Sequence, residues 1–135
     1  MAIRFVEIHP ATEAELLNTE WVVLENDGKQ PFQTRGCGVT VSMRGQTKRS
    51  VLGVIDPGFL LAPGEKVRML TGSPGKEGEG EPPPETDGIK NYYLLLPKTY
   101  LRGAGTTLTM TLRGMPVCKV EHDPAAPQGV VVKAG

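Results

Sequence analysis

The feature that most constrains the fold is the run LNTEWVVLEN at residues 17–26, the most strand-like stretch of the chain. Its centre is apolar at Val22, Val23 and Leu24 in succession, and an Asn-Asp-Gly turn signal follows at its exit. A strand that is apolar on both faces belongs in the middle of a sheet, or has one face in the core and the other on a partner. We therefore expect the other strands to pack around this one.

Several other stretches alternate between apolar and polar residues, as a strand with one buried face does. The clearest is 106–113, where Leu108, Met110 and Leu112 are predicted to face inward and the threonines between them outward. Val67 and Met69 are predicted to point inward in the same way. Further strands are predicted at 3–8, 38–44, 50–55, 92–96 and 116–120. About eight short strands separated by turns are typical of an all-β sandwich or barrel.

The first of these strands, at residues 3–8, has apolar residues on both of its faces. Simple alternation places Ile3 and Phe5 on one face and Val6 and Ile8 on the other. A His-Pro pair directly after the strand marks its end.

The size and composition of the chain fit one β-rich domain. A chain of 135 residues can bury a sizeable core but is too short for two comfortable domains, and 17 glycines with 12 prolines suit many turns. Fifteen basic and fifteen acidic residues leave no net charge that would draw the chain to nucleic acid or to an acidic membrane. Because neither a signal peptide nor a membrane-spanning run is recognisable, we expect a cytoplasmic protein that does not insert into membranes.

Two segments depart from the strand pattern. Residues 72–91 are crowded with glycine, proline and acidic residues and have almost nothing apolar to bury, which predicts a long acidic excursion. Residues 124–135 are predicted to form a tail outside a domain that covers 1–123. The tail contains one β-prone cluster, formed by Val130, Val131 and Val132, which could pair with an exposed sheet edge of another subunit.

Four runs, taken in this order, resemble the lamin tail domain, the sandwich of nuclear lamins that also occurs in many bacterial proteins. They are LNTEWVVLEN, GCGVTV, GFLLAPGEKVRMLTG and TTLTMTLRGMPVCKV, and the resemblance covers roughly residues 3–121. Its sharpest pieces are Glu20-Trp21-Val22 with Asn26, and Leu61-Ala62-Pro63-Gly64. The resemblance implies an immunoglobulin-like β-sandwich with a non-catalytic role in interaction or tethering.

The chain also departs from this family in one large side chain. The usual Gly-Trp at the start of the third strand is Gly36-Cys37 here, so Trp21 is expected to fill more of the interior. Cys37 and Cys118 are expected to remain free thiols, with a disulfide between them as the alternative.

A catalytic or metal site is not expected. A nucleophilic triad needs a histidine base, and the only histidines, His9 and His122, each follow a predicted strand end. The run Glu121-His122-Asp123 cannot converge on one ion because adjacent strand residues point to opposite faces. We therefore expect no cofactor and no enzymatic activity.

Three groups of residues are candidates for an interface. Trp21 and Val23 would form an apolar outer patch if their neighbours fill the core, although both faces of this strand could also be covered within the chain. Arg44, Lys48 and Arg49 cluster in a predicted hairpin loop. One interpretation is that these charges only keep the tip of the loop solvated. The other is that they contact phosphate or an acidic partner, and the acidic segment of a second copy of the chain could be that partner. The third group is the valine cluster of the tail.

Together these features predict a non-catalytic protein-interaction or assembly subunit that binds another protein or a further copy of itself. The alternative is an accessory domain that recognises nucleic acid or polysaccharide through the basic hairpin, and its binding would then fall steeply with salt concentration.

Overall fold

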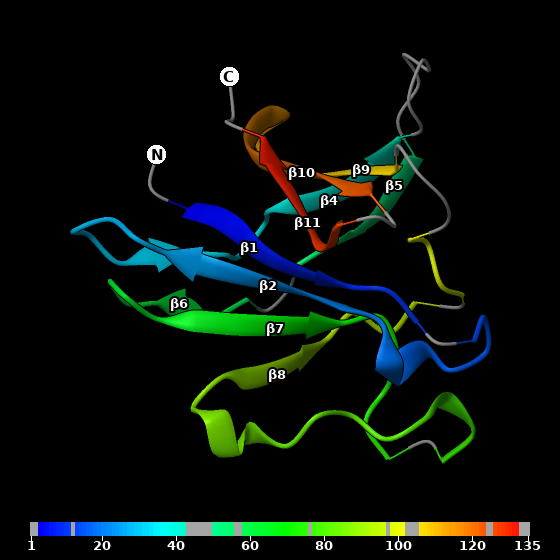
Figure 1. The fold of residues 1–135 in the computed structure, drawn as a ribbon. Coiled ribbons are helices and arrows are strands. Elements are labelled where there is room, and N and C mark those ends of the chain that lie inside the picture. Colours follow the sequence, from blue (N-terminus) through cyan, green and yellow to red (C-terminus); the bar gives the residue numbers. More distant parts are fainter. Residues whose placement is uncertain are drawn as a thin grey trace.

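The computed structural model describes residues 3–11, 13–42, 50–55, 58–75, 77–96, 98–101, 106–123 and 126–132. Within these residues, two β-sheets pack face to face (Figure 1). The first has the order β1-β2-β7-β8 and contains β1 (Ile3–His9), β2 (Trp21–Asn26), β7 (Lys66–Leu70) and β8 (Lys90–Tyr93). The second has the order β11-β10-β9-β4-β5 and contains β4 (Gly38–Ser42), β5 (Ser50–Val54), β9 (Thr106–Leu112), β10 (Met115–Asp123) and β11 (Ala126–Val132). The chain is therefore an all-β sandwich.

Short elements complete the fold. The strands β3 (Phe32–Gln33) and β6 (Leu60–Leu61) pair with each other in a separate ladder. The helical turns are η1 (Leu17–Thr19), η2 (Glu77–Glu79) and η3 (Glu85–Asp87), all of the 3₁₀ type. None of the helices in the described ranges has the length and apolar character needed to cross a membrane.

The core lies between the two sheets and is formed by the alternating strands. It contains the side chains that were predicted to face inward, namely Val22, Leu24, Val67, Met69, Leu108 and Met110. Leu112 packs against this core but is only partly buried. Thr109, on the opposite face of β9, is also buried, so this face of the sheet is not fully exposed to solvent.

The first strand is irregular, and the simple alternation predicted for it is wrong. Phe5 pairs with Leu24 and Glu7 pairs with Val23, so Val6 is an extra residue on β1. Such a β-bulge shifts the side chains after it to the opposite face. As a result Ile8 joins Phe5 in the core, although the two residues are an odd number of positions apart.

The predicted positions of Trp21 and Val23 are only partly correct. Both lie on the face of the β1-β2-β7-β8 sheet that points away from the core, as the alternation with Val22 and Leu24 requires. Val23 is nevertheless only 1 % exposed, so an exposed apolar patch does not form at this position. Trp21 is half-buried on this outer face and does not fill the space between the sheets, which corrects the expectation drawn from Gly36-Cys37.

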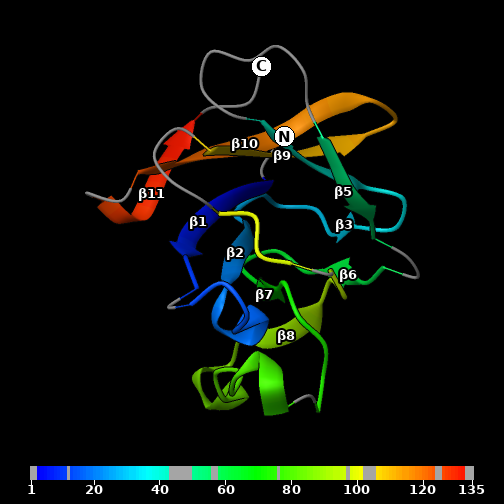
Figure 2. The ribbon, with the colours of Figure 1, turned by 90° about the vertical axis from the view of Figure 1, so that its right-hand side faces the viewer.

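The acidic segment 72–91 connects β7 to β8, and these two strands are parallel, with Val67 opposite Lys90. A parallel pair cannot be joined by a tight hairpin and needs a crossover of about a dozen residues or more. The segment supplies that length, and its last residues already belong to β8. It lies beyond β8, on the side away from the five-stranded sheet (Figure 2).

Residues 126–132 of the predicted tail form the strand β11 of the five-stranded sheet. β11 pairs antiparallel with β10 of the same chain, with Lys119 opposite Val132 and Glu121 opposite Val130. It forms an edge of the five-stranded sheet and runs close to β1 (Figure 1). The valine cluster therefore pairs within the chain, and the expected pairing with another subunit is not needed to order this strand.

Candidate functional site

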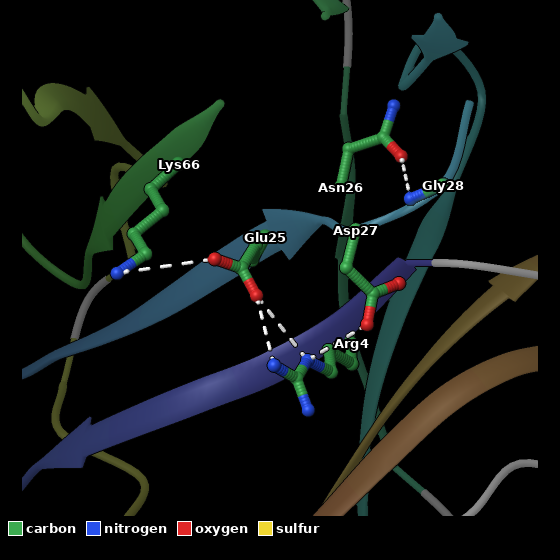
Figure 3. Close-up of polar contacts among 6 residues, drawn as sticks. All are labelled: Arg4, Glu25, Asn26, Asp27, Gly28 and Lys66. Atoms are coloured by element: carbon green, nitrogen blue, oxygen red, sulfur yellow. Dashed lines mark hydrogen bonds and ion pairs between the residues drawn. The ribbon is translucent and has the colours of Figure 1, made fainter. Parts of the chain in front are cut away.

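Asn26 and the run Leu61-Ala62-Pro63-Gly64, two distant pieces of the sequence, meet in the structure. The side-chain nitrogen of Asn26 donates hydrogen bonds to the carbonyls of Leu61 (2.9 Å) and Gln30 (2.8 Å). Its side-chain oxygen accepts from the N–H of Gly28 at 2.9 Å (Figure 3). The N–H of Gly64 donates to the Asn26 carbonyl at 2.6 Å. Because Asn26 is buried and its amide is fully used, this residue holds the loop that leads into β7 and is not a binding group.

Glu20, directly before β2, is fully buried. Its carboxyl oxygens accept hydrogen bonds from the Thr71 hydroxyl (2.6 Å) and from the N–H groups of Tyr100 (3.1 Å) and Leu101 (3.1 Å). Burial, followed by the nearby charge of Glu20, raises the pKa of the Tyr100 hydroxyl far above its usual range. Neither of the cavities described below is lined by these residues. Glu20 therefore joins β2, the end of β7 and the segment 98–101, and we assign it a structural role.

The outer face of the four-stranded sheet is covered by side chains from within the chain. The rings of His9 and Trp21 stack with centroids 3.9 Å apart and an angle of 8°. His9 also lies 2.8 Å from the Thr19 carbonyl through Nδ1. The guanidinium carbon of Arg68 is 5.5 Å from the centre of the Trp21 ring, within the range of a cation–π contact. Trp21 is therefore engaged by its own chain on this face.

Arg68 connects this face to the acidic segment. It is buried, and its guanidinium donates to Asn91 Oδ1 at 2.6 Å and to the carboxylate of Asp87. The pKa of the Asp87 carboxyl group is lowered, first by the hydrogen bond from the N–H of Ile89 and further by Arg68. Asp87 thus acts as the counter-ion of a buried arginine, which gives this acidic residue of the crossover a structural role.

The opposite end of the same face carries an exposed row of charges. Arg4 contacts Glu25 at 3.0 Å and Asp27 at 3.2 Å, and Lys66 lies 3.9 Å from the other oxygen of Glu25 (Figure 3). Exposed ion pairs of this kind contribute little, typically about 0–1 kcal/mol. We interpret this row as a solvated surface and not as a binding site.

A cleft of about 240 Å³ opens between the start of β7, the edge strand β8 and the segment around β6. Phe59 and Tyr92 meet in it with ring centroids 4.9 Å apart at an angle of 51°. The residues that line the cleft are Gly58, Phe59, Leu60, Leu61, Glu65, Lys66, Val67, Lys90, Asn91 and Tyr92. It is therefore a mainly apolar opening with two lysines in its lining.

Large exposed apolar side chains also occur in β5, in β6 and after β8. Leu60 lines the cleft and is 59 % exposed, while Val54 on β5 (62 %) lines a second, smaller cavity together with Leu94 and Leu96. Leu95, between these two leucines, is 64 % exposed. We call Val54, Leu60, Leu95 and the cleft the open side of the sandwich.

Leu95 also has an unusual backbone. Its φ angle is +59°, in the left-handed region where a leucine costs about 1 kcal/mol or more. The conformation is held by hydrogen bonds from the N–H of Leu94 to Leu70, of Leu95 to Gly72 and of Leu96 to Thr71, at 2.8, 3.1 and 2.8 Å. An apolar side chain is thus held away from the core in a conformation that a polar asparagine or a glycine would adopt more easily.

Of the interface residues expected from the sequence, Trp21 and Val23 have described side chains, and neither lines this cleft. Arg44, Lys48 and Arg49 lie outside the described residues, so the basic hairpin stays a prediction. For Val130, Val131 and Val132 the structure describes only the backbone, in β11. The cleft itself had no local signal, because its walls come from β6, β7 and β8 and meet only in the folded chain.

Among the residues that the structure describes, no three His, Cys, Asp or Glu side chains are grouped as metal ligands. Cys37 and Cys118 are both buried and free, as expected, and not bridged. Burial raises the pKa of Cys37, and burial together with the neighbouring Cys37 raises the pKa of Cys118 to about 12.

The structure thus defines an all-β sandwich domain with a small, mainly apolar cleft on its open side. Comparison of the chain with protein-family models and with curated proteins found no match.

Proposed function

We propose that the chain is a non-catalytic protein-interaction domain that binds a partner through the open side of the sandwich. The observation that carries the proposal is the exposed Leu95 in its strained backbone conformation, in the segment that follows β8. Backbone strain persists where the surrounding structure enforces it, and strained positions cluster at binding sites. A large exposed apolar side chain on such a site favours contact with another protein.

A relationship to the lamin tail domain, and with it an immunoglobulin-like arrangement of the sandwich, remains part of this proposal. It is supported by the contact between Asn26 and the loop Leu61-Ala62-Pro63-Gly64, since the two pieces on which the resemblance rests form one structural unit. The family resemblance in turn favours an interaction or tethering role over catalysis.

The proposal is tested by cross-linking the purified chain in a cell extract and by light scattering of the chain alone. Leu95→Asn removes the apolar group but suits a left-handed backbone, so the fold is expected to be kept. Met115→Asn is the matched control, because Met115 is 69 % exposed in the hairpin between β9 and β10. We expect wild type and Met115→Asn to cross-link to a partner or to self-associate. Leu95→Asn should lose that interaction.

Two results would contradict this function. One is a strict monomer at high concentration with no partner recovered from the extract. The other is an equal loss of binding in Leu95→Asn and in Met115→Asn, which would show that the effect does not come from the open side.

A further inference from the structure

The size of the cleft limits what can enter it. Sites for small molecules and cofactors typically enclose about 300–1,000 Å³, whereas a cavity of about 150 Å³ already accepts a benzene ring. At about 240 Å³, the cleft matches one large side chain better than a nucleotide or a sugar chain. A ligand that fits it would be a protein segment that inserts a single residue.

The lining determines which side chain fits. Phe59 and Tyr92 form a tilted aromatic pair, and Leu61 and Val67 extend from the cleft into the core of the sandwich. Aromatic rings prefer offset or edge-to-face neighbours, and such pairs add about 0.5–1.5 kcal/mol beyond the burial of their area. An aromatic or large aliphatic side chain would therefore find both apolar surface and a ring partner.

The charges at the cleft favour an acidic neighbour for that side chain. Lys90 is opposite Val67 in the parallel ladder, so both side chains lie on the cleft side of the sheet. Among the described residues Lys90 forms no ion pair, whereas Lys66 is already near Glu25. Of the lining residues that the structure describes, Glu65 alone has a carboxylate, and it accepts a hydrogen bond from the N–H of Ala62 at 3.0 Å. A carboxylate on the ligand would thus meet an available cation.

Pairing of the ligand as an additional strand on β8 is disfavoured. The N–H of Asn91 donates to the Glu85 carboxylate at 2.6 Å, and the Asn91 side chain donates to the Pro83 carbonyl at 2.8 Å. The chain's own acidic segment therefore occupies this part of the sheet edge, as edge-protecting segments do. Recognition would depend on side chains in the cleft.

We propose that the cleft binds a segment of a partner protein that inserts one aromatic or large aliphatic side chain beside Phe59 and Tyr92 and places an adjacent carboxylate against Lys90. The inference rests on the proposed function and specifies the chemistry of its partner.

The test uses short peptides and amide chemical shifts of the ¹⁵N-labelled full chain. The probe is acetyl-Gly-Asp-Phe-Asp-Gly-amide, and the matched peptides replace both Asp by Lys or the Phe by Ala. We expect the Asp-Phe-Asp peptide, added to about 5 mM, to shift the amides of Leu61, Val67 and Tyr92. It should bind a few-fold more tightly than the Lys-Phe-Lys peptide, as an exposed ion pair allows. The Asp-Ala-Asp peptide should leave these amides unchanged.

Charge reversal separates the role of Lys90 from general electrostatics. Lys90→Glu should reverse the preference between the two Phe peptides, and its own spectrum reports whether it is folded. Lys98→Glu is the control, because Lys98 is exposed and does not line the cleft.

Several results would overturn the inference. The first is that the Lys-Phe-Lys or the Asp-Ala-Asp peptide binds at the cleft as tightly as the probe. The second is that the probe does not bind, or that it shifts amides away from the cleft. The third is that Lys90→Glu and Lys98→Glu weaken binding of the probe equally. In each of these cases the proposed interaction function would still stand if Leu95→Asn, but not Met115→Asn, loses the cross-linked partner.

Discussion

Two acidic residues of the chain have their positions determined by the donors around them. Glu20 brings a carboxyl group into the interior, where the Thr71 hydroxyl and two backbone N–H groups donate to it. Asp87 stays at the surface and pairs with the buried guanidinium of Arg68. Buried polar groups cost little while they are hydrogen-bonded and much more when a partner is removed. Both carboxyl groups can therefore be tested by removing them.

Glu20→Ala should lower the free energy of unfolding by about 3 kcal/mol or more, because it leaves three buried donors without an acceptor. Urea unfolding followed by the fluorescence of Trp21 measures the loss. Glu13→Ala, at an exposed glutamate, is the control and should change stability by less than about 0.5 kcal/mol. A loss below about 1 kcal/mol for Glu20→Ala would show that these contacts are not important for stability.

The stability of the chain should depend on the ionisation of Asp87. Its pKa in the folded state is lowered below the unfolded value, so its contribution is present above about pH 4 and is lost as the pH falls through the folded pKa. Asp87→Asn should therefore be less stable than wild type at pH 7, and the difference should shrink as both are acidified. Urea midpoints measured across this pH range provide the comparison.

Glu81→Gln is the control for Asp87, because it removes a negative charge from an exposed position of the same segment. It should not reproduce the pH-dependent difference. If the difference between wild type and Asp87→Asn is constant from pH 7 to below the folded pKa, the pairing with Arg68 does not stabilise the fold.

At the scale of elements, the acidic segment 72–91 has a defined path although it buries few apolar side chains. Polar contacts hold its start: Asn18 donates to the carbonyls of Ser73 (2.9 Å) and Gly80 (3.3 Å), and the N–H of Ser73 donates to Glu79 at 2.8 Å. Gly72 lies against this group, and a methyl group there would come within 2.3 Å of Asn18 Oδ1 and 2.8 Å of Glu79 Oε1. The glycine is thus required by close packing.

Gly72→Ala should destabilise the chain by about 1–3 kcal/mol, as overpacking of a buried site does, because Asn18 is buried and held by two carbonyls. Gly78→Ala is the matched control in the same segment, since a methyl group there meets no atom within 4 Å. Thermal unfolding of both variants gives the comparison. Equal effects of the two substitutions would contradict the packing of the segment against Asn18.

At the scale of the whole molecule, the sandwich is completed by its last strand. β11 pairs with β10 and runs close to β1, so it connects an edge of the five-stranded sheet to the first strand of the other sheet. Removing it would expose the edge of β10, and an exposed sheet edge is a template for pairing between chains. β11 is thus expected to stabilise the single molecule.

A chain truncated after Asp123 should unfold at lower urea concentration than the intact chain and should associate as its concentration rises. Size-exclusion chromatography with light scattering, combined with urea unfolding, measures both effects. A chain truncated after Val132 keeps β11 and is the control. The opposite result would be an oligomeric intact chain and a monomeric chain truncated after Asp123. It would show that β11 pairs with another subunit and not with β10 of its own chain.

Much of the sandwich could be predicted from the sequence, because alternation along a strand is a local property. The inward positions of Val67, Met69, Leu108 and Met110 follow from the two-residue period of a strand. Turn chemistry is local as well: Arg113 and Gly114, which join β9 to β10, have φ angles of +54° and +80°, as a two-residue hairpin turn requires.

Only the tertiary structure determines which distant segments of the chain become neighbours. The bulge at Val6 moves Ile8 into the core. Val23 is buried on the outer face of its sheet, where Arg68 of the same sheet contacts Asp87 of the acidic crossover. The parallel pairing of β7 with β8 requires that crossover and at the same time places Lys90 and Tyr92 beside Phe59. A periodic pattern determines which face of a strand is apolar, but contacts between distant strands determine what covers that face and where a cleft remains.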